Sequence, residues 1–575
     1  MTLNGVTITN TNNSPDYAGL DFYDRNATMT VTADTTISSK IINSSKLTID
    51  VAEGKTLSLD SPLRNASGAT CEFLKTGKGD ISTTNWFGAG ATLTIDEGSV
   101  ILPTNFGNGN RIAGTMTINE NGTLVSNAKD SIGYSTNAGV YNIVGGTWLK
   151  MDGNNETLGN KTFNFTGGKI TSAYTDANGN AVDNNGTFDI YKTKTTFNSF
   201  AAEGATADNP TVATVDVRIC LRNDEPFAIT AAENSKLVFN KEILNGGSGV
   251  YSLTVNGDGV VEFRAANTYT GGTTINSGTL LLTENGTLGT GAIALNGGAL
   301  EIGYDTDTTF TKDITGTGTL AKSGAGTLTI SDAKSFAGNT AVKQGKLLVT
   351  GAGTLGTVPG DITIAEGAEL EFAVDEGDVK KTGAVSGQGS VLKTGKGTLQ
   401  IDNSAYNEGY DDVQFGTITA QDGRLDAKGV YEGTFVIDAP AIFSPGNSIG
   451  TLKTDVFQLN AGATLLMEQD ASGMDKLIAN TFIIDDDAII EFALTSAQPG
   501  ATYEIFNDPE GLDGQYADVN YWTSFLSPAD AYYWNLTVDG YSVFASVDAN
   551  AVPEPSTWAL LALGALGLLY WRKRK

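Results

Sequence analysis

The sequence predicts an all-β fold in which short strands stack as the successive coils of a long solenoid. Three observations predict it: apolar and polar residues alternate, one turn motif recurs, and longer units repeat at nearly fixed spacing. Alternation places the apolar side chains of a strand on one face. A unit that cannot bury this face alone must stack on its neighbours, and this makes a solenoid.

The alternating segments run through most of the chain. Examples are Leu47/Ile49, Leu93/Ile95, Met116/Ile118, Leu253/Val255 and Leu328/Ile330. The recurring turn is an apolar residue, two polar residues, Gly, any residue and another apolar residue. It occurs at Ile95–Val100, Ile275–Leu280, Val342–Leu347 and Ala420–Leu425. Its Gly supplies the left-handed backbone conformation that a corner requires.

A longer unit contains the pattern Lys-x-Gly-x-Gly-Thr-Leu. Gly257 and Gly324 are 67 residues apart, and Gly324 and Gly395 are 71 apart. Lys322 and Lys393 occupy equivalent positions, and we interpret them as structural because an active site needs only one copy. With roughly two dozen residues per coil and about 4.8 Å between coils, the body is predicted to be a rod on the order of 100 Å long.

Composition excludes several classes of function. The net charge of −29 argues against nucleic acid as a partner, since phosphate binding needs a basic surface. The chain has no histidine, which removes Ser-His-Asp and Cys-His catalysis and the commonest zinc ligand. Cys71 and Cys220 have no metal or redox spacing, and a disulfide between them stays open. We expect no cofactor.

Three acidic clusters follow or precede predicted strands: Asp305/Asp307, Asp375/Glu376/Asp378 and Asp485–Asp487. Carboxylates of this kind could hold Ca²⁺. None has the Gly-rich nonapeptide pattern of calcium-binding β-rolls. We therefore interpret them as solvated turns and predict no metal site.

The chain divides into four predicted regions: an irregular β-helical region at 1–250, a repeat region at 251–440, terminal coils and a cap at 441–550, and a tail at 551–575. An aromatic cluster near the end of the third region is predicted to close the core; the alternative is a platform on which carbohydrate stacks. Its members are Tyr521, Trp522, Tyr532, Tyr533 and Trp534. We expect no helix before the tail.

The tail combines three features in a fixed order. Pro553, Glu554 and Pro555 precede an uncharged run from Trp558 to Trp571, which includes Leu560, Leu563, Leu566 and Leu569, and Arg572, Lys573, Arg574 and Lys575 end the chain. The run is shorter than the roughly 20 residues that cross a bilayer, but aromatic ends and snorkelling cations suit a short transmembrane helix. Basic residues stay cytoplasmic, so the body should lie across the membrane.

This tail resembles the PEP-CTERM sorting signal. The resemblance implies processing by an exosortase in Gram-negative bacteria that make exopolysaccharide, with Pro553, Glu554 and Pro555 as the recognition motif. Such proteins need an export signal, yet Met1 to Asp24 contains no Lys or Arg and no apolar run. We expect that the gene is truncated or begins at the wrong position, or that a first module has been cut from a longer chain. The alternative is a protein that is not exported, and the tail argues against it.

The body resembles the autotransporter-associated β-strand repeat at Leu253–Leu280, Gly318–Val349 and Gly389–Leu425. This resemblance implies a right-handed parallel β-helix. Phe443–Leu452, with Thr464–Glu468 and Asp475–Leu477, is similar to a motif near the end of autotransporter passengers. About 100 residues follow and end in the predicted helix, so we do not expect a self-translocating autotransporter.

The sequence therefore predicts a non-enzymatic exported surface or extracellular-matrix protein, a structural or adhesin-like rod sorted through its tail. Its expected partners are an exosortase-like enzyme, the membrane, and exopolysaccharide or a host or neighbour surface. One alternative is a carbohydrate-active enzyme, since β-helix sites can use Asp, Lys and Arg. The other is the passenger of an autotransporter-like secretion system.

Overall fold

The computed structural model describes the body of the chain with gaps. The described residues are 1–3, 7–8, 19–22, 26–65, 71–85, 91–104, 114–132, 138–151, 155–173, 187–191, 194–223, 225–283, 285–331, 333–334, 336–350, 354–355, 360–381, 383–404, 414–446, 448–470, 472–494, 500–512, 514–525 and 534–547.

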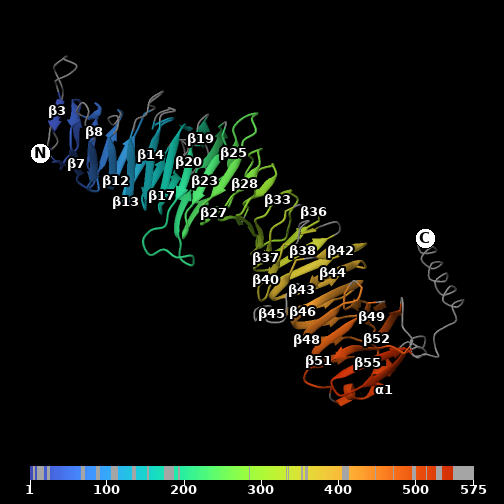
Figure 1. The fold of residues 1–575 in the computed structure, drawn as a ribbon. Coiled ribbons are helices and arrows are strands. Elements are labelled where there is room, and N and C mark those ends of the chain that lie inside the picture. The colour runs from blue at the N-terminus through green and yellow to red at the C-terminus, as the bar shows by residue number, and fades with distance from the viewer. Residues whose placement is uncertain are drawn as a thin grey trace. The chain divides into compact units, whose positions relative to one another are not determined.

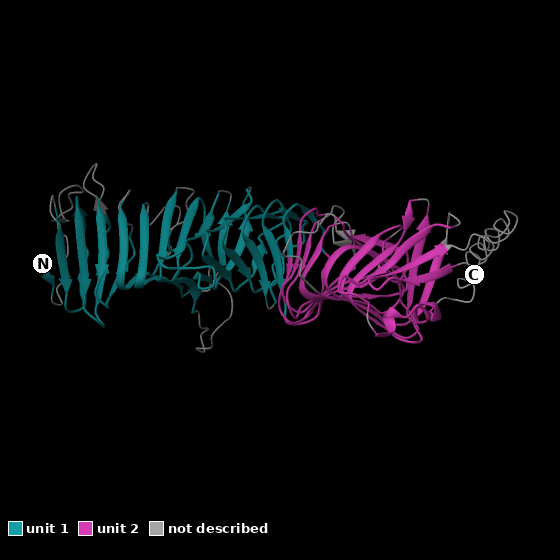
Figure 2. Ribbon diagram, turned by 60° about the horizontal axis from the view of Figure 1, so that its bottom comes forward, with its two compact units in different colours: residues 1–304, 312–320 teal, residues 305–311, 321–575 magenta. Residues whose placement is uncertain are grey.

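The described chain forms a parallel β-solenoid of about 17 turns with almost no helix (Figure 1). The predicted all-β solenoid is confirmed, and its right-handed sense stays a prediction. Two compact units are distinguished: unit 1 comprises residues 1–304 and 312–320, and unit 2 comprises residues 305–311 and 321–575 (Figure 2).

Unit 1 begins with parallel ladders in which like residues stack on like. One ladder contains β4 (Ala27–Val31), β7 (Lys46–Val51), β10 (Glu72–Thr76), β12 (Thr92–Leu102) and β13 (Thr115–Ser126). Its register aligns Leu47, Phe73, Leu93 and Met116, all of which are buried. The predicted alternation therefore builds one continuous apolar core.

The middle of unit 1 has an aromatic core. The strands β14 (Gly139–Val144), β17 (Lys161–Thr166) and β20 (Thr196–Ser199) pair in parallel. Tyr141 stacks on Phe163 with ring centroids 5.2 Å apart, and Phe163 packs on Phe197 at 4.8 Å. The aligned residues are 22 and 34 positions apart in the chain. The coils therefore differ in length, but their core residues still align regularly. This holds within the region 1–250, which was predicted to be irregular.

The repeat region at the end of unit 1 has shorter and more uniform coils. One ladder contains β26 (Leu253–Asn256), β28 (Thr273–Ile275), β30 (Ile293–Leu295) and β33 (Ile314–Gly316). Successive aligned residues are 20 or 21 positions apart, slightly fewer than expected. A 67-residue repeat therefore holds about three coils.

Unit 2 continues the same construction. One face contains β42 (Asp378–Lys381), β44 (Thr398–Asn403), β46 (Arg424–Ile437), β47 (Ile442–Ser444), β49 (Thr464–Asp470) and β52 (Ile489–Leu494). Another contains β43 (Val385–Thr394), β45 (Gln414–Ala420), the second half of β46, β48 (Thr451–Leu459) and β51 (Lys476–Ile484). The long strand β46 spans both faces.

The last coil of unit 2 is closed by a cap. The strands β53 (Thr502–Asn507), β55 (Ser542–Val547) and β54 (Trp534–Val538) pair antiparallel, and beside them lie the 3₁₀ helix η1 (Gly514–Ala517) and α1 (Val519–Ser524). Trp522 is fully buried and stacks on Phe506 at 4.6 Å. The buried rings of Trp522 and Trp534 fit the predicted cap and present no face to a sugar. Tyr532 and Tyr533 lie outside the described residues.

The helix α1 was not predicted. It is only six residues long, and its amphipathic pattern is too short to recognise in the sequence. Asp518 is its N-cap, and the carboxylate accepts a hydrogen bond from the Asn520 backbone N–H at 2.8 Å.

Candidate functional site

Three lysines make the same contacts in different coils. Each lies at the end of a strand with its Nζ turned into the following turn, where it donates to three backbone carbonyls. The acceptors of Lys75 are Thr76, Gly77 and Glu97; those of Lys322 are Ser323, Gly324 and Gln344; those of Lys393 are Thr394, Gly395 and Asp422. The first two acceptors belong to the lysine's own turn and the third to the next coil.

These lysines are buried, and burial lowers the pKa of each ammonium group. Burial lowers the pKa of Lys393 to about 8, while Asp422 and Asp375 act in the opposite direction. Lys75 has a pKa lowered to about 8 for the same reason. At Val255, the equivalent position of a degenerate copy, a buried valine replaces the lysine. A structural role for Lys322 and Lys393, inferred from their recurrence, fits these contacts.

The Ser444–Gly450 loop connects β47 to β48 and is fastened to one buried carboxylate. The Gly450 and Glu468 backbone N–H groups donate to Asp475 Oδ1 and Oδ2, each at 2.8 Å. Ser444 Oγ lies 3.4 Å from Asp475 Oδ2 and 3.3 Å from Glu468 Oε2. The three segments of the passenger-like motif are therefore joined by this network.

The network extends to a second buried carboxylate. Arg424 Nη2 donates to Glu468 Oε2 at 3.1 Å, and Arg424 Nε pairs with Asp426 Oδ1. Burial raises the pKa of Asp426 to about 6, against the opposing effect of Arg424. Burial likewise raises the pKa of Asp475 to about 7. Asp475 is fully buried, so it can position the loop but cannot meet a substrate.

Sequence reasoning missed Arg424 and Asp426 as members of this site. In β46, Asp426 occupies an outward position between the apolar residues Leu425 and Ala427, so alternation predicts a solvated side chain. It is only 2% exposed. A charged residue between apolar neighbours is a weak indication by itself, because only the folded loop shows what covers it.

The acidic clusters at strand ends bind backbone groups of adjacent coils. Asp305 and Asp307 accept hydrogen bonds from the Ala325 and Thr327 N–H groups at 2.9 and 2.7 Å. Asp485 accepts from the Ala461 N–H at 3.1 Å. Within the described ranges, no three His, Cys, Asp or Glu residues gather closely enough to hold a metal ion.

Both cysteines are buried. Burial raises the pKa of the Cys71 thiol to about 11, so it is protonated and unreactive at neutral pH. The disulfide that the sequence left open is not formed.

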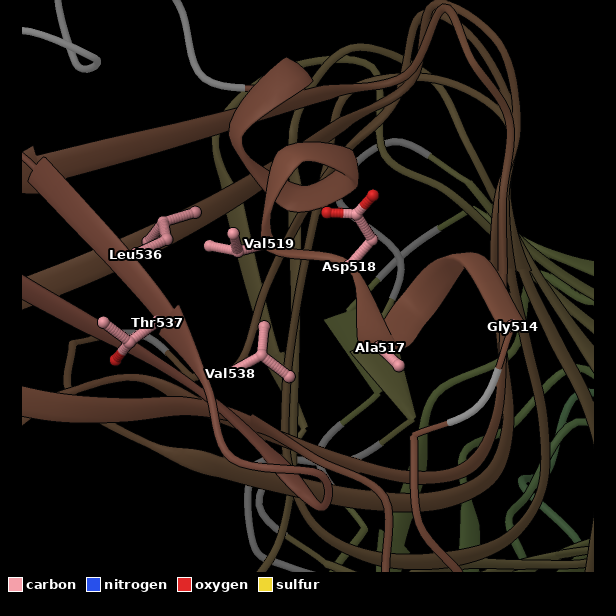
Figure 3. A pocket seen from close by; sticks show the side chains of 7 residues that line it. All are labelled: Gly514, Ala517, Asp518, Val519, Leu536, Thr537 and Val538. Atoms are coloured by element: carbon pink, nitrogen blue, oxygen red, sulfur yellow. The ribbon is translucent and has the colours of Figure 1, made fainter.

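A shallow hollow lies in the cap between the two short helices and β54 (Figure 3). Its walls are mostly aliphatic, with Val519 on one side and Leu536 and Val538 on the other. The Asp518 carboxylate already accepts the capping hydrogen bond from the Asn520 N–H of α1. The hollow offers a mostly aliphatic surface for contact.

The predicted sorting residues Pro553, Glu554 and Pro555, the run Trp558–Trp571 and the cations Arg572–Lys575 lie outside the described residues. Of the helices that the structure describes, none has the length and apolar character to span a membrane.

The fold and the repeat chemistry together define the class of protein: a parallel β-helix repeat protein in which recurring polar groups hold the coils together. Comparison with known proteins adds the particulars. Residues 551–575 match the PEP-CTERM protein-sorting motif. Residues 253–282 and 320–349 match the passenger-associated-transport-repeat, at two of the three predicted copies. The chain thus carries both features that its sequence resembled.

One curated relative is the "Adhesin BmaC autotransporter" of Brucella suis biovar 1 (strain 1330). It is 27% identical over 218 residues, which cover 34% of this chain and 6% of that protein. The chain therefore matches a small part of a much longer relative. Taken together, the sorting motif and the repeats indicate an exported surface protein.

Proposed function

We propose that this protein is a non-enzymatic rod of the cell surface or extracellular matrix, with a structural or adhesin-like role. The observation that carries the proposal is the sorting motif at residues 551–575 behind a body of passenger-type repeats. The recurring buried lysines support it, because their ammonium groups donate hydrogen bonds to carbonyls of the next coil and so join the coils. We further propose the four regions 1–250, 251–440, 441–550 and 551–575 as its functional divisions.

The tail gives the proposed route. Trp558–Trp571 holds the chain in the membrane with Arg572–Lys575 in the cytoplasm. An exosortase-type enzyme then recognises Pro553, Glu554 and Pro555 and releases the body. Pro553 and Pro555 keep the motif extended, because proline cannot continue a helix upstream.

The experiment is mass spectrometry of the mature full-length product in an exosortase-positive host. We expect the residues after Pro555 to be lost in that host and retained in an exosortase-deficient one. Glu554→Ala should block processing, whereas Glu510→Ala, at an exposed residue of the cap, should leave it unchanged. Recovery of intact Lys575 from the surface fraction of the competent host would contradict the proposal.

The non-enzymatic role is tested separately. The purified full chain should release neither reducing nor unsaturated sugars from the host's exopolysaccharide. Sustained release that scales with protein concentration would replace this role with that of a carbohydrate-active enzyme.

A further inference from the structure

We propose that unit 1 binds a second copy of this chain through one uncharged face of its solenoid, which we call the Thr/Asn face. Nothing in the sorting role requires this contact, so the two proposals can fail independently.

The Thr/Asn face consists of the outward side chains of one parallel ladder in unit 1. The ladder runs from β12 through β13, β14, β17, β20, β23 (Phe227–Ala231), β26, β28 and β30 to β33 (Figure 1). Strands about 4.8 Å apart make this face on the order of 40 Å long. Its residues, each at least partly exposed, are Thr92, Thr94, Thr115, Thr117, Val140, Asn142, Thr162, Asn164, Thr196, Asn198, Ala228, Thr230, Thr254, Asn256, Thr274, Asn276, Ala294, Asn296 and Thr315.

Charge distinguishes this face from its surroundings. None of its residues is charged, in a chain whose net charge is −29. A second ladder of the same coils has charged outward residues, among them Lys169, Lys236 and Glu301. Two copies that met on acidic surface would repel each other, whereas the Thr/Asn face allows them to approach without a like-charge contact.

Hydrogen bonds between coils hold the amides of the face in place. Asn164 Nδ2 donates to Asn142 Oδ1, and Asn198 Nδ2 donates to Asn164 Oδ1, both at 3.0 Å. A second row, at 2.9 and 3.0 Å, joins Asn256, Asn276 and Asn296. An amide has two N–H donors and two acceptor lone pairs, so a residue in the middle of a row keeps one donor and one acceptor for a partner. Because these side chains are ordered before contact, the entropic cost of binding is lower.

The chemistry of the face fits a second copy of itself. Amides and hydroxyls both donate and accept hydrogen bonds, so a surface made of them is complementary to itself, whereas a surface of carboxylates is not. A two-fold contact requires this property, because the same patch lies on both sides. The number of side chains also approaches the roughly 20–30 residues that each partner contributes to a standard interface. The face is therefore large enough for a reversible dimer.

The test is sedimentation velocity of the full chain, in a mild non-ionic detergent that shields the apolar run Trp558–Trp571. We expect a reversible monomer–dimer equilibrium for the wild type. The double variant Thr196→Asp/Thr230→Asp places like charges near the middle of the face and should raise the dissociation constant at least tenfold. Its matched control, Thr147→Asp/Thr279→Asp, makes the same change of net charge on outward positions of the second ladder and should dimerise like the wild type.

Thr196→Lys is a second variant should the double substitution lose its fold. It makes the chain less acidic, yet it places a charge inside the contact and should weaken the dimer as well. Added NaCl screens the net repulsion between copies and should strengthen wild-type association. The proposal is overturned if the wild type stays monomeric, if NaCl abolishes its association, or if the folded face variants dimerise like the wild type. It is also overturned if association requires added exopolysaccharide, because the face would then bind that polymer.

Discussion

A buried ammonium group fixes two coils at once. Lys393 uses all three of its donors on carbonyl oxygens, two in its own turn and one in the next coil. Without that cation the three carbonyls would lose their shared donor inside a low-dielectric site. Val255 shows that a buried apolar side chain can occupy the equivalent position of another copy.

Lys393→Met tests this role at the level of one residue. Methionine keeps most of the aliphatic stem but leaves buried carbonyls unpaired, so the free energy of unfolding of unit 2 should fall by about 2–4 kcal/mol. Lys396→Met, three residues further on and exposed, should change it by less than about 0.5 kcal/mol. Urea unfolding measures both. Equal effects of the two substitutions would contradict the structural role.

Glu156 in unit 1 predicts a pH dependence. It is fully buried, accepts hydrogen bonds from Ser131 and Ile132, and its pKa is raised from 4.5 to about 7 by burial. A carboxyl whose pKa is higher in the folded state stabilises the fold most below pH 4.5. That stabilisation is lost as the pH rises through 7, by an amount on the order of 3 kcal/mol.

The comparison is between wild type and Glu156→Gln, with unfolding free energies measured from pH 4.5 to pH 8. The wild type should lose stability relative to the variant across this range. Glu120→Gln, at an exposed strand position, should follow the wild type. Parallel curves for wild type and Glu156→Gln would show that the carboxyl does not titrate as described.

At the scale of the element, the turn is where coils approach most closely. Gly423 has φ of +68°, and a Cβ there would lie 2.5 Å from the carbonyl oxygens of both Gly395 and Gly397. Gly367 has φ of +76° with nothing within 4 Å. The first glycine is therefore required by both backbone conformation and stacking, and the second by conformation alone.

These two glycines give a matched pair of substitutions. Gly367→Ala should destabilise unit 2 by about 1–2 kcal/mol, the cost of a left-handed L-residue. Gly423→Ala must also displace two carbonyls and should cost at least twice as much. Urea unfolding separates the two contributions. If the two alanine variants were equally stable, the close contact at Gly423 would make no contribution to the free energy of unfolding.

Strands were predictable where coils are short and alternation is strict. Leu47, Leu93 and Met116 were identified from the pattern and do align in the core. The packing of Phe163 against Phe197 was not predictable, because 34 residues separate them and no fixed period marks the pair. Asp426 was missed for a different reason: alternation assigns it an outward position, yet its side chain is buried and paired with Arg424.

At the scale of the whole molecule, each coil contacts mainly its neighbours, so stability is local. In such an architecture, damage in one part need not spread to another. The described contacts divide the chain into two units, each with its own apolar core.

Phe163→Asp in unit 1 and Phe457→Asp in unit 2 test this independence, since both rings are fully buried. Each substitution should expose only its own unit to protease, and mass spectrometry of the resistant fragments should recover the other. Simultaneous digestion of both units in either variant would show that they unfold as one.

The cap has a consequence for the protein's behaviour after secretion. Every coil of a solenoid is a template for the next, and the last one has no successor. In unit 2, β53 and the buried Trp522 occupy that final template. A chain cleaved before Thr502 would expose the unpaired strand edges of its last coil. A second cleaved chain could then pair with those edges. We therefore expect the final strands and their tryptophans to prevent end-to-end stacking of one chain on another.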